Sequence, residues 1–334
     1  HWMRLTDKQK LAKNPDAQTQ KVLDNLIAEN TYKEARLKHT EQFQEKLFDE
    51  IVGRIKKDDE SVPYLHNGYW YYTRFEKDKE DPIYCRKKES LDNAEEIMIN
   101  VNELAEGYDY FSLTGLSVSP NNRLLAFSID TLSRRIYTIK IKNLETGEIL
   151  SDEIISTEGG TTWANDNQTF FYTTKNEVTL LSEHIDRHKL GTSQSKDVRV
   201  YTEKDNSFYI GVYRSKSDKY IIIYNSSTLS SDYHVLNADN PEGEFHSFSP
   251  RDKKHEYSIE HYKDKFYIIT NWNATNFRLM ETPDDATSKE NWTEVMAHRD
   301  DVLLSEIDVF ENHLVISERK EGLRQLRIID QQSE

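Results

Sequence analysis

The stretch "VPYLHNGYWYYTRFEKDKEDPIYCRKKE", residues 62–89, holds two aromatic-rich runs separated by the charged connector "EKDKEDP". The first run covers residues 69–75 and the second covers residues 83–85. The connector is too polar to bury and ends at Pro82, so the pattern predicts a hairpin of two adjacent strands. A single hairpin is not stable alone in water. This one must therefore pack against other units of the chain.

The same turn-and-strand phrase recurs from residue 61 to the end of the chain. Each copy has two or three polar turn residues, then an apolar or aromatic strand, then Ser, Thr or a charged residue. The copies are "HNGYWYYT" (66–73), "NNRLLAFS" (121–128), "NDNQTFFYT" (165–173), "SDKYIIIY" (217–224), "KDKFYIIT" (263–270) and "ENHLVISE" (311–318). Their strands begin near residues 69, 124, 169, 220, 266 and 314. An interval of about 45 to 55 residues, with several strands per unit, is typical of β-propellers.

The fold class is therefore predicted to be all-β, a β-propeller with six visible repeats. An all-β sandwich or barrel is the alternative, since it also shows strands separated by turns. The missing WD dipeptide argues against WD40 repeats. The run "RIYTIKIKNLETG" (135–147) alternates apolar and polar residues before a turn, and we interpret it as the second strand of a unit. We expect six strand residues to be buried: Leu125, Phe127, Phe171, Ile222, Ile268 and Val315.

The first sixty residues differ from the rest. Asp16 is a candidate helix cap, and apolar residues follow at helical spacing in two stripes. The stripes are Val22, Leu23, Leu26 and Ile27, then Leu47, Phe48, Ile51, Val52 and Ile55. We predict one or two amphipathic helices over roughly residues 16–57, docked on the domain that follows; a lipid- or partner-binding helix is the alternative. The expected domains are thus a helical segment over 1–60 and the propeller over 61–334.

Composition limits the partners. The chain has 334 residues, 59 of them acidic and 44 basic, for a net charge of −15. Such a charge repels nucleic acid and anionic membranes and attracts cations, so we expect neither nucleic acid nor a membrane as a partner. The one cysteine, Cys85, excludes an internal disulfide framework and fits a reducing compartment. We expect a cytoplasmic protein; a periplasmic one stays open, because the chain opens "HWMRLTDKQK" without a starting Met.

No stretch of the sequence supports a catalytic, metal or cofactor site. The serine strings "GLSVS" (115–119) and "GTSQS" (191–195) lack the second glycine that a nucleophile elbow needs. The histidines of "HEYSIEH" (255–261) are six apart rather than four. His184 and His188 are four apart, but without a carboxylate–base arrangement alongside we expect a surface or core role. Cys85 is expected to be a packed thiol. We assign no catalytic residue, no cofactor-binding residue, no metal ligand and no cofactor.

Several long phrases resemble one known group of proteins. The run "RIKKDDESVPYLHNGYWYYTRFEKDKEDPIYCRKK" is similar to the entry to the propeller in the oligopeptidase B (protease II) branch of the prolyl oligopeptidase family of serine peptidases. The resemblance continues through "NVNELAEGYDYFSLTGLSVSPNNRLLAFSIDTLSRRIYTIKIKNLETG", "RHKLGTSQSKDVRVYTEKD" and "HSFSPRDKKHEYSIEHYKDKFYIITNWNATNF". The segment "TLLSEHIDRH" departs from the pattern of the family.

The resemblance implies a two-domain enzyme, with a seven-bladed propeller capping an α/β-hydrolase domain that carries a Ser-His-Asp triad. Members cleave short peptides after Arg and Lys, and all three triad residues lie in the C-terminal domain. We therefore expect this chain to be the substrate-gating propeller, truncated before its last blade and inactive alone, with short basic peptides and the C-terminal hydrolase domain as partners. The negative charge would enrich basic peptides, or serve solubility only. The alternative function is a stand-alone propeller acting as a protein-interaction scaffold.

Overall fold

The computed structural model describes residues 5–6, 9, 12–176 and 178–331. The chain forms two compact units. The first contains the described residues up to Ser61 together with Arg74–Glu80, and the second contains Val62–Thr73 and the residues from Asp81 onward.

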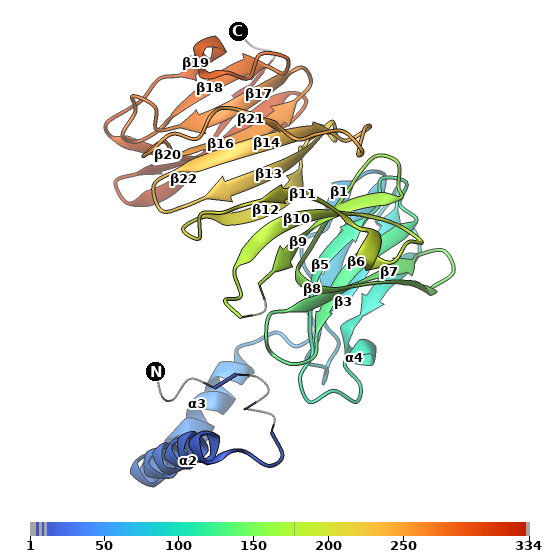
Figure 1. The fold of residues 1–334 in the computed structure, drawn as a ribbon, viewed down its shortest axis with the longest axis vertical. Helices are drawn as coiled ribbons and strands as arrows, with labels where there is room; N and C mark the ends of the chain where they lie inside the picture. The colour runs from blue at the N-terminus through green and yellow to red at the C-terminus, as the bar shows by residue number, and fades with distance from the viewer. Residues whose placement is uncertain (1–4, 7–8, 10–11, 177, 332–334) are drawn as a thin grey trace. The chain divides into compact units, whose positions relative to one another are not determined.

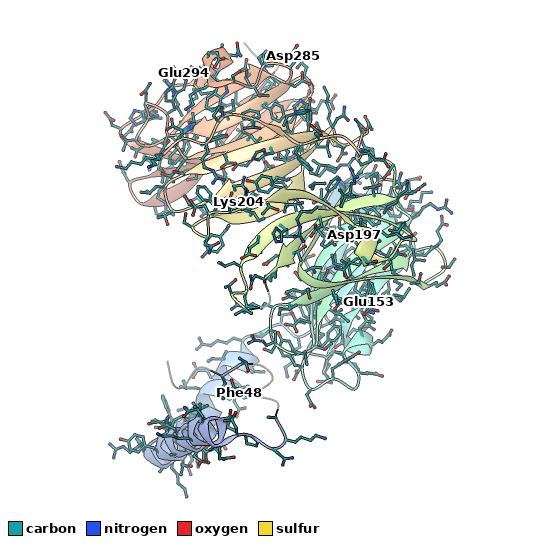
Figure 2. All side chains as sticks on the ribbon, in the orientation of Figure 1. Phe48, Glu153, Asp197, Lys204, Asp285 and Glu294 are labelled. Atoms are coloured by element: carbon teal, nitrogen blue, oxygen red, sulfur yellow. The ribbon has the colours of Figure 1, made fainter. Side chains whose placement is uncertain are left out.

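The first unit is helical. Helix α2 (Ala17–Leu37) leads through one 3₁₀ turn, η1 (Lys38–Thr40), into helix α3 (Glu41–Gly53). The carboxylate of Asp16 accepts a hydrogen bond from the backbone N–H of Thr19 at 2.7 Å, so the predicted cap is present. The helices expected within 16–57 are confirmed. Much of the apolar stripe of α3 is exposed, including Phe48 (Figure 2); docking of this segment stays a prediction. None of the helices in the described residues is long and apolar enough to span a membrane.

The second unit is built of antiparallel sheets (Figure 1). The first sheet contains β1 (Tyr64–His66), β2 (Tyr69–Arg74), β3 (Ile83–Lys88) and β4 (Glu95–Asn100), followed by the short helix α4 (Val101–Leu104). A seven-stranded sheet contains β5 (Ser112–Val118), β6 (Leu124–Asp130), β7 (Tyr137–Asn143), β8 (Ile149–Trp163), β9 (Thr169–Lys175), β10 (Ser182–Lys189) and β11 (Val198–Thr202).

Three smaller sheets complete the unit. The first contains β12 (Tyr209–Arg214), β13 (Tyr220–Ser226), β14 (Ser231–Asn237) and β15 (His246–Ser247). The second contains β16 (Tyr257–Tyr262), β17 (Lys265–Thr270), β18 (Arg278–Pro283) and β19 (Thr293–Met296). The third contains β20 (Val302–Val309), β21 (His313–Lys320) and β22 (Leu323–Asp330). Two further 3₁₀ turns are η2 (Gln194–Lys196) and η3 (Lys289–Asn291).

The seven-stranded sheet is two blades that share one long strand. β8 pairs with β7 from Ile149 to Thr157 and with β9 from Thr157 to Trp163. Its first half therefore closes one blade and its second half opens the next. This gives six blades: β1–β4 are blade 1, β5 to the first half of β8 blade 2, and the second half of β8 to β11 blade 3. Blades 4, 5 and 6 are β12–β15, β16–β19 and β20–β22.

The repeated phrase of the sequence is the turn before the second strand of each blade. Those second strands begin at residues 69, 124, 169, 220, 265 and 313, within one residue of the predicted starts. In five of the six phrases a non-glycine turn residue has a positive φ, a conformation that Asn and Asp tolerate best; these are Asn67, Asn122, Asn167, Asp218 and Lys263. The run 135–147 contains β7, which is the third strand of its blade rather than the second, because β5 precedes the phrase.

Consecutive blades pack face to face through apolar side chains. One cluster joins each neighbouring pair: Tyr71 with Phe127 for blades 1 and 2, Ile141 with Trp163 for blades 2 and 3, Phe171 with Ile221 for blades 3 and 4, Ile222 with Phe266 for blades 4 and 5, and Ile269 with Leu314 for blades 5 and 6. Five of the predicted core residues, Leu125, Phe127, Phe171, Ile222 and Ile268, are at most 1% exposed. The propeller expected from the repeat is confirmed.

Val315 is the exception, and its predicted burial is wrong. It is only half-buried, whereas Leu314 and Ile316 on either side of it are buried against blade 5. Because side chains alternate along a strand, Val315 lies on the opposite face of blade 6, paired with the exposed Ile328. Among the described residues, no apolar cluster joins this face to another blade.

Candidate functional site at the axial mouth

The first strands of the blades end around one depression. First strands of different blades contact one another, as β5 contacts β8, β8 contacts β12 and β16 contacts β20, so they form the inner edge of the blades. Two hollows of about 320 and 480 Å³ lie where these strands end, and both are lined by His66, Asn67, Arg214 and Asp218. We call the two hollows the axial mouth. Every blade contributes: His66 from blade 1, Ser119 from blade 2, Thr162 from blade 3, Arg214 from blade 4, Tyr262 from blade 5 and Phe310 from blade 6.

The turn 215–218 of blade 4 is fixed to the first strand of blade 5. The backbone N–H of Lys216 donates to Glu260 Oε1 at 2.9 Å, and the N–H of Ser217 donates to the carbonyl of His261 at 3.2 Å. The hydroxyl of Ser217 also lies 2.7 Å from Nδ1 of His261. Two hydrogen bonds of the main chain and one of the Ser217 side chain therefore hold this turn, while the side chain of Lys216 is left to extend over the mouth.

The side chain of Lys216 reaches blade 6. Its Nζ lies 2.8 Å from Oδ1 of Asp308 and 3.7 Å from the centre of the Phe310 ring. The cation is thus held between a carboxylate and an aromatic face, both of which attract it. The contact joins two blades that are not neighbours and crosses the larger hollow. All three side chains remain open to solvent, at 32% exposure for Lys216, 67% for Asp308 and 46% for Phe310.

The other charges of the mouth are of both signs. Arg214 donates to Asp218 Oδ1 at 2.7 Å and to the carbonyl of Trp163 at 3.1 Å, linking blades 3 and 4. Burial raises the pKa of Glu260 above its usual range, although the two backbone N–H groups of Lys216 and His261 oppose the shift. Glu311 lines the larger hollow and, within the described part of the chain, makes no ion pair.

The structure gives His184 and His188 different roles. His188 is fully buried in blade 3, with Nδ1 2.7 Å from Asp197 and Nε2 3.1 Å from Asp152; Asp197 is labelled in Figure 2. Burial alone would lower the pKa of His188, but the hydrogen bonds to the two carboxylates raise it. His184 lies 3.1 Å from the hydroxyl of Thr202 instead. His188 therefore has a core role, as expected for one of the two histidines. The spacing of the histidines did not predict the two carboxylates that hold its ring.

The histidines of "HEYSIEH" are both buried, one in β16 and one just before it. Nε2 of His255 lies 2.8 Å from the hydroxyl of Thr270. Burial lowers the pKa of His255 to about 4, with the charge of Lys289 adding to the shift. Burial also lowers the pKa of His261 to about 4. Both side chains are therefore neutral packing groups. The described residues contain no group of three or more His, Cys, Asp or Glu side chains placed to hold a metal.

Within the described residues, the serines of the two candidate strings and Ser217 are not placed as nucleophiles. Ser117, the middle serine of "GLSVS", lies within strand β5 opposite Ala126 of β6. Ser119, at the end of that string, donates to Asn121 and accepts from the N–H of Leu124, which closes a turn. Ser193 and Ser195 bond to each other in the same way. Ser217 Oγ lies 2.7 Å from Nδ1 of His261, and Nε2 of the same ring lies 3.6 Å from Asp284. His261 is completely buried, however, and the Ser217 oxygen accepts the N–H of Lys219. These hydroxyls stabilise turns.

Sequence reasoning missed Lys216 and Phe310, which line the larger hollow, and Glu260 and Asp308, which hold Lys216. A usable signal was present, because each repeated phrase marks the point where the first strand of a blade has just ended. Lys216 lies directly before the phrase that begins at residue 217, and Phe310 directly before the one at 311. Lys216, Tyr262 and Phe310, which each directly precede a phrase, line the larger hollow, and Pro120, which precedes another, lines the smaller one.

Comparisons with known proteins agree on one family. A family model described as "Prolyl oligopeptidase, N-terminal beta-propeller domain" matches residues 13–334. The chain is 40% identical to dipeptidyl aminopeptidase BI of Pseudoxanthomonas mexicana over an alignment of 328 positions, which covers 93% of this chain and 45% of that protein. It is 32% identical to protease 2 of Moraxella lacunata, covering 94% of this chain and 46% of that protein.

A solved structure gives the same result. Oligopeptidase B from Leishmania major superposes with a TM-score of 0.89 at 30% identity, covering 99% of this chain and 46% of that one. The chain therefore spans less than half the length of the relatives it matches.

Proposed function

Because the chain belongs to the prolyl oligopeptidase family, we propose that it is the substrate-gating propeller of a peptidase that acts on short peptides. The observation that carries this proposal is the axial mouth, where the first strands of all six blades end around the same pair of hollows. The proposed gate would admit a flexible peptide and exclude a folded domain. The catalytic serine, histidine and aspartate would belong to an α/β-hydrolase domain, which is the proposed partner of this chain.

The proposed substrates are peptides that carry Arg or Lys. The net charge of −15 supports this class, because it raises the local concentration of cationic peptides. Glu311 places one of those carboxylates in the lining of the axial mouth, and Asp308 binds Lys216, which also lines it. Salt screens such an attraction, so the preference should weaken as ionic strength rises.

A second activity is favoured by a specific relative. The protein at 40% identity is named a dipeptidyl aminopeptidase. Removal of dipeptides from a free amino terminus is therefore the second candidate, with the same gating role for the propeller.

The test compares two reporters on the protein encoded by the whole gene. One is an Arg reporter with a blocked amino terminus, and the other is a dipeptide reporter with a free one. We expect the blocked reporter to be cleaved; cleavage of the free dipeptide alone would favour the second candidate. The 334-residue chain should cleave neither, and turnover by it that a serine-directed inhibitor stops would overturn the proposal. A stop codon directly after residue 334 would favour the alternative function, a stand-alone propeller that acts as a protein-interaction scaffold.

We further propose a cytoplasmic location. The single cysteine, Cys85, is a buried free thiol, which fits a reducing compartment. Fractionation of cells that express the gene at its native level would test this, and recovery from the periplasm would contradict it.

A further inference from the structure

Lys216, Asp308 and Phe310 form a contact that skips a blade. The ammonium group comes from the turn of blade 4, and the carboxylate and ring come from the end of the first strand of blade 6. We propose that Asp308 and Phe310 form a subsite for a primary ammonium group of an incoming peptide, and that Lys216 occupies this subsite as an internal latch until the peptide displaces it. This rests on the proposed gating function and extends it to a particular part of the mouth.

The ammonium group of Lys216, which occupies the subsite, indicates which ligands the subsite can bind. A carboxylate at 2.8 Å and an aromatic face at 3.7 Å bind Lys216 Nζ from two sides. Both interactions recognise any alkylammonium group of the same size. A lysine side chain and the free amino terminus of a peptide each supply one. The hollow around this contact, about 480 Å³, has room for more than the Lys216 side chain.

The latch can open without a change of the fold. The main chain of the turn is tied to blade 5 through Glu260 and His261, so only the side chain of Lys216 has to rotate. Asp308 is 67% exposed, so a peptide can reach it from solvent. An ion pair this open to water is weak and easily exchanged. Glu311 lines the same hollow and would favour the arriving cation.

The surroundings argue against a purely structural role for the pair. The blades on either side are already joined by apolar clusters, blade 4 to blade 5 through Ile222 and Phe266, and blade 5 to blade 6 through Ile269 and Leu314. A solvent-exposed lysine adds little to such packing. The position of the Lys216 side chain over the axial mouth therefore explains the contact better than a contribution to the stability of the fold does.

Peptide binding to the 334-residue chain tests the proposal. Three peptides of one sequence, labelled at the carboxyl end, are titrated by fluorescence anisotropy: acetylated with one lysine, acetylated with norleucine in its place, and norleucine with a free amino terminus. Lys216→Met should tighten binding of the peptides that carry an ammonium group by about two- to fivefold, the range of an exposed ion pair. Asp308→Asn should weaken it, and the acetylated norleucine peptide should respond to neither change. The lysine and free-terminus peptides show which source of ammonium the subsite prefers.

Lys204→Met is the matched control. Lys204 is exposed, follows the outermost strand of blade 3 (Figure 2), and its loss changes the net charge by the same amount. If Lys204→Met and Lys216→Met tighten peptide binding equally, the latch is overturned. Unchanged or weaker peptide binding by Lys216→Met, with an unchanged unfolding midpoint, would also overturn it. Reporter turnover by the whole gene product without tightening in Lys216→Met would reject the latch alone. Tightening without turnover would reject the peptidase function alone.

Discussion

The two faces of blade 6 carry similar side chains but have different environments. On one face Leu314 and Ile316 are buried against blade 5. On the other face Leu326 and Ile328 are 68% and 66% exposed, and Val315 is half-buried. Because side chains alternate along a strand, the two sets lie on opposite faces of the same three-stranded sheet, a few residues apart. Burial in this protein is therefore decided by whether a neighbouring blade is present, not by the hydrophobicity of the strand.

The strongest test of the packed faces is at the junction of blades 3 and 4. Phe171 is completely buried there, beside Ile221 and Ile223. Phe171→Ala removes most of a buried ring and leaves a cavity, so it should lower the free energy of unfolding by about 3–5 kcal/mol. Urea unfolding of the 334-residue chain, followed by circular dichroism, measures the change. A loss no larger than that of an exposed substitution would mean that the blade interfaces are not where stability resides.

A matched pair in blade 6 sharpens the comparison. Ile316 is fully buried and Ile328 is mostly exposed. Ile316→Ala should cost about 2–5 kcal/mol of unfolding free energy, whereas Ile328→Ala should stay within about 0.5 kcal/mol. The same urea titration applies to both variants. Equal losses would show that Ile328 is covered in solution.

The sequence predicted where the strands lie better than which face of a strand is buried. The repeated turns located the first residue of each second strand to within one position, because the Asn and Asp residues that adopt positive φ in these turns can be recognised in the sequence. Val315 could not be placed correctly, since Leu314, Val315 and Ile316 are equally apolar and only the neighbouring blade distinguishes their faces. The mouth residues were missed for a related reason: Lys216 and Asp308 are 92 positions apart, and only the ring of blades brings them together.

The buried histidines predict how packing responds to acid. The pKa values of His255 and His261 are lowered to about 4 in the folded chain, against an ordinary value of 6.5. The unfolded chain therefore binds protons that the folded chain does not, so stability should be complete above pH 6.5 and fall as the pH drops toward 4. Thermal midpoints between pH 7 and pH 4 measure this. The variant His255→Gln, His261→Gln should show a flatter profile; an unchanged slope would contradict the assignment.

The smallest effect is expected from the exposed face itself. Uncovered apolar strands favour association, so the 334-residue chain should form some dimers at high concentration. Replacing both Leu326 and Ile328 by Lys should shift it toward the monomer, as measured by light scattering. The matched change Leu132→Lys, at an exposed position outside this face, should have no effect. Association that persists in the double variant would locate the contact elsewhere.

Gating by the propeller, which would admit flexible peptides and exclude folded proteins, is tested most directly by one measurement. The whole gene product is given a free ten-residue peptide with one cleavage site, and separately the same peptide joined by a short linker to a folded domain. An unrelated protease with an open active site must cut both at similar rates, which shows that the site is accessible. We predict that the whole gene product cleaves the free peptide and leaves the tethered one intact. Cleavage of both at the same rate would contradict the gating account.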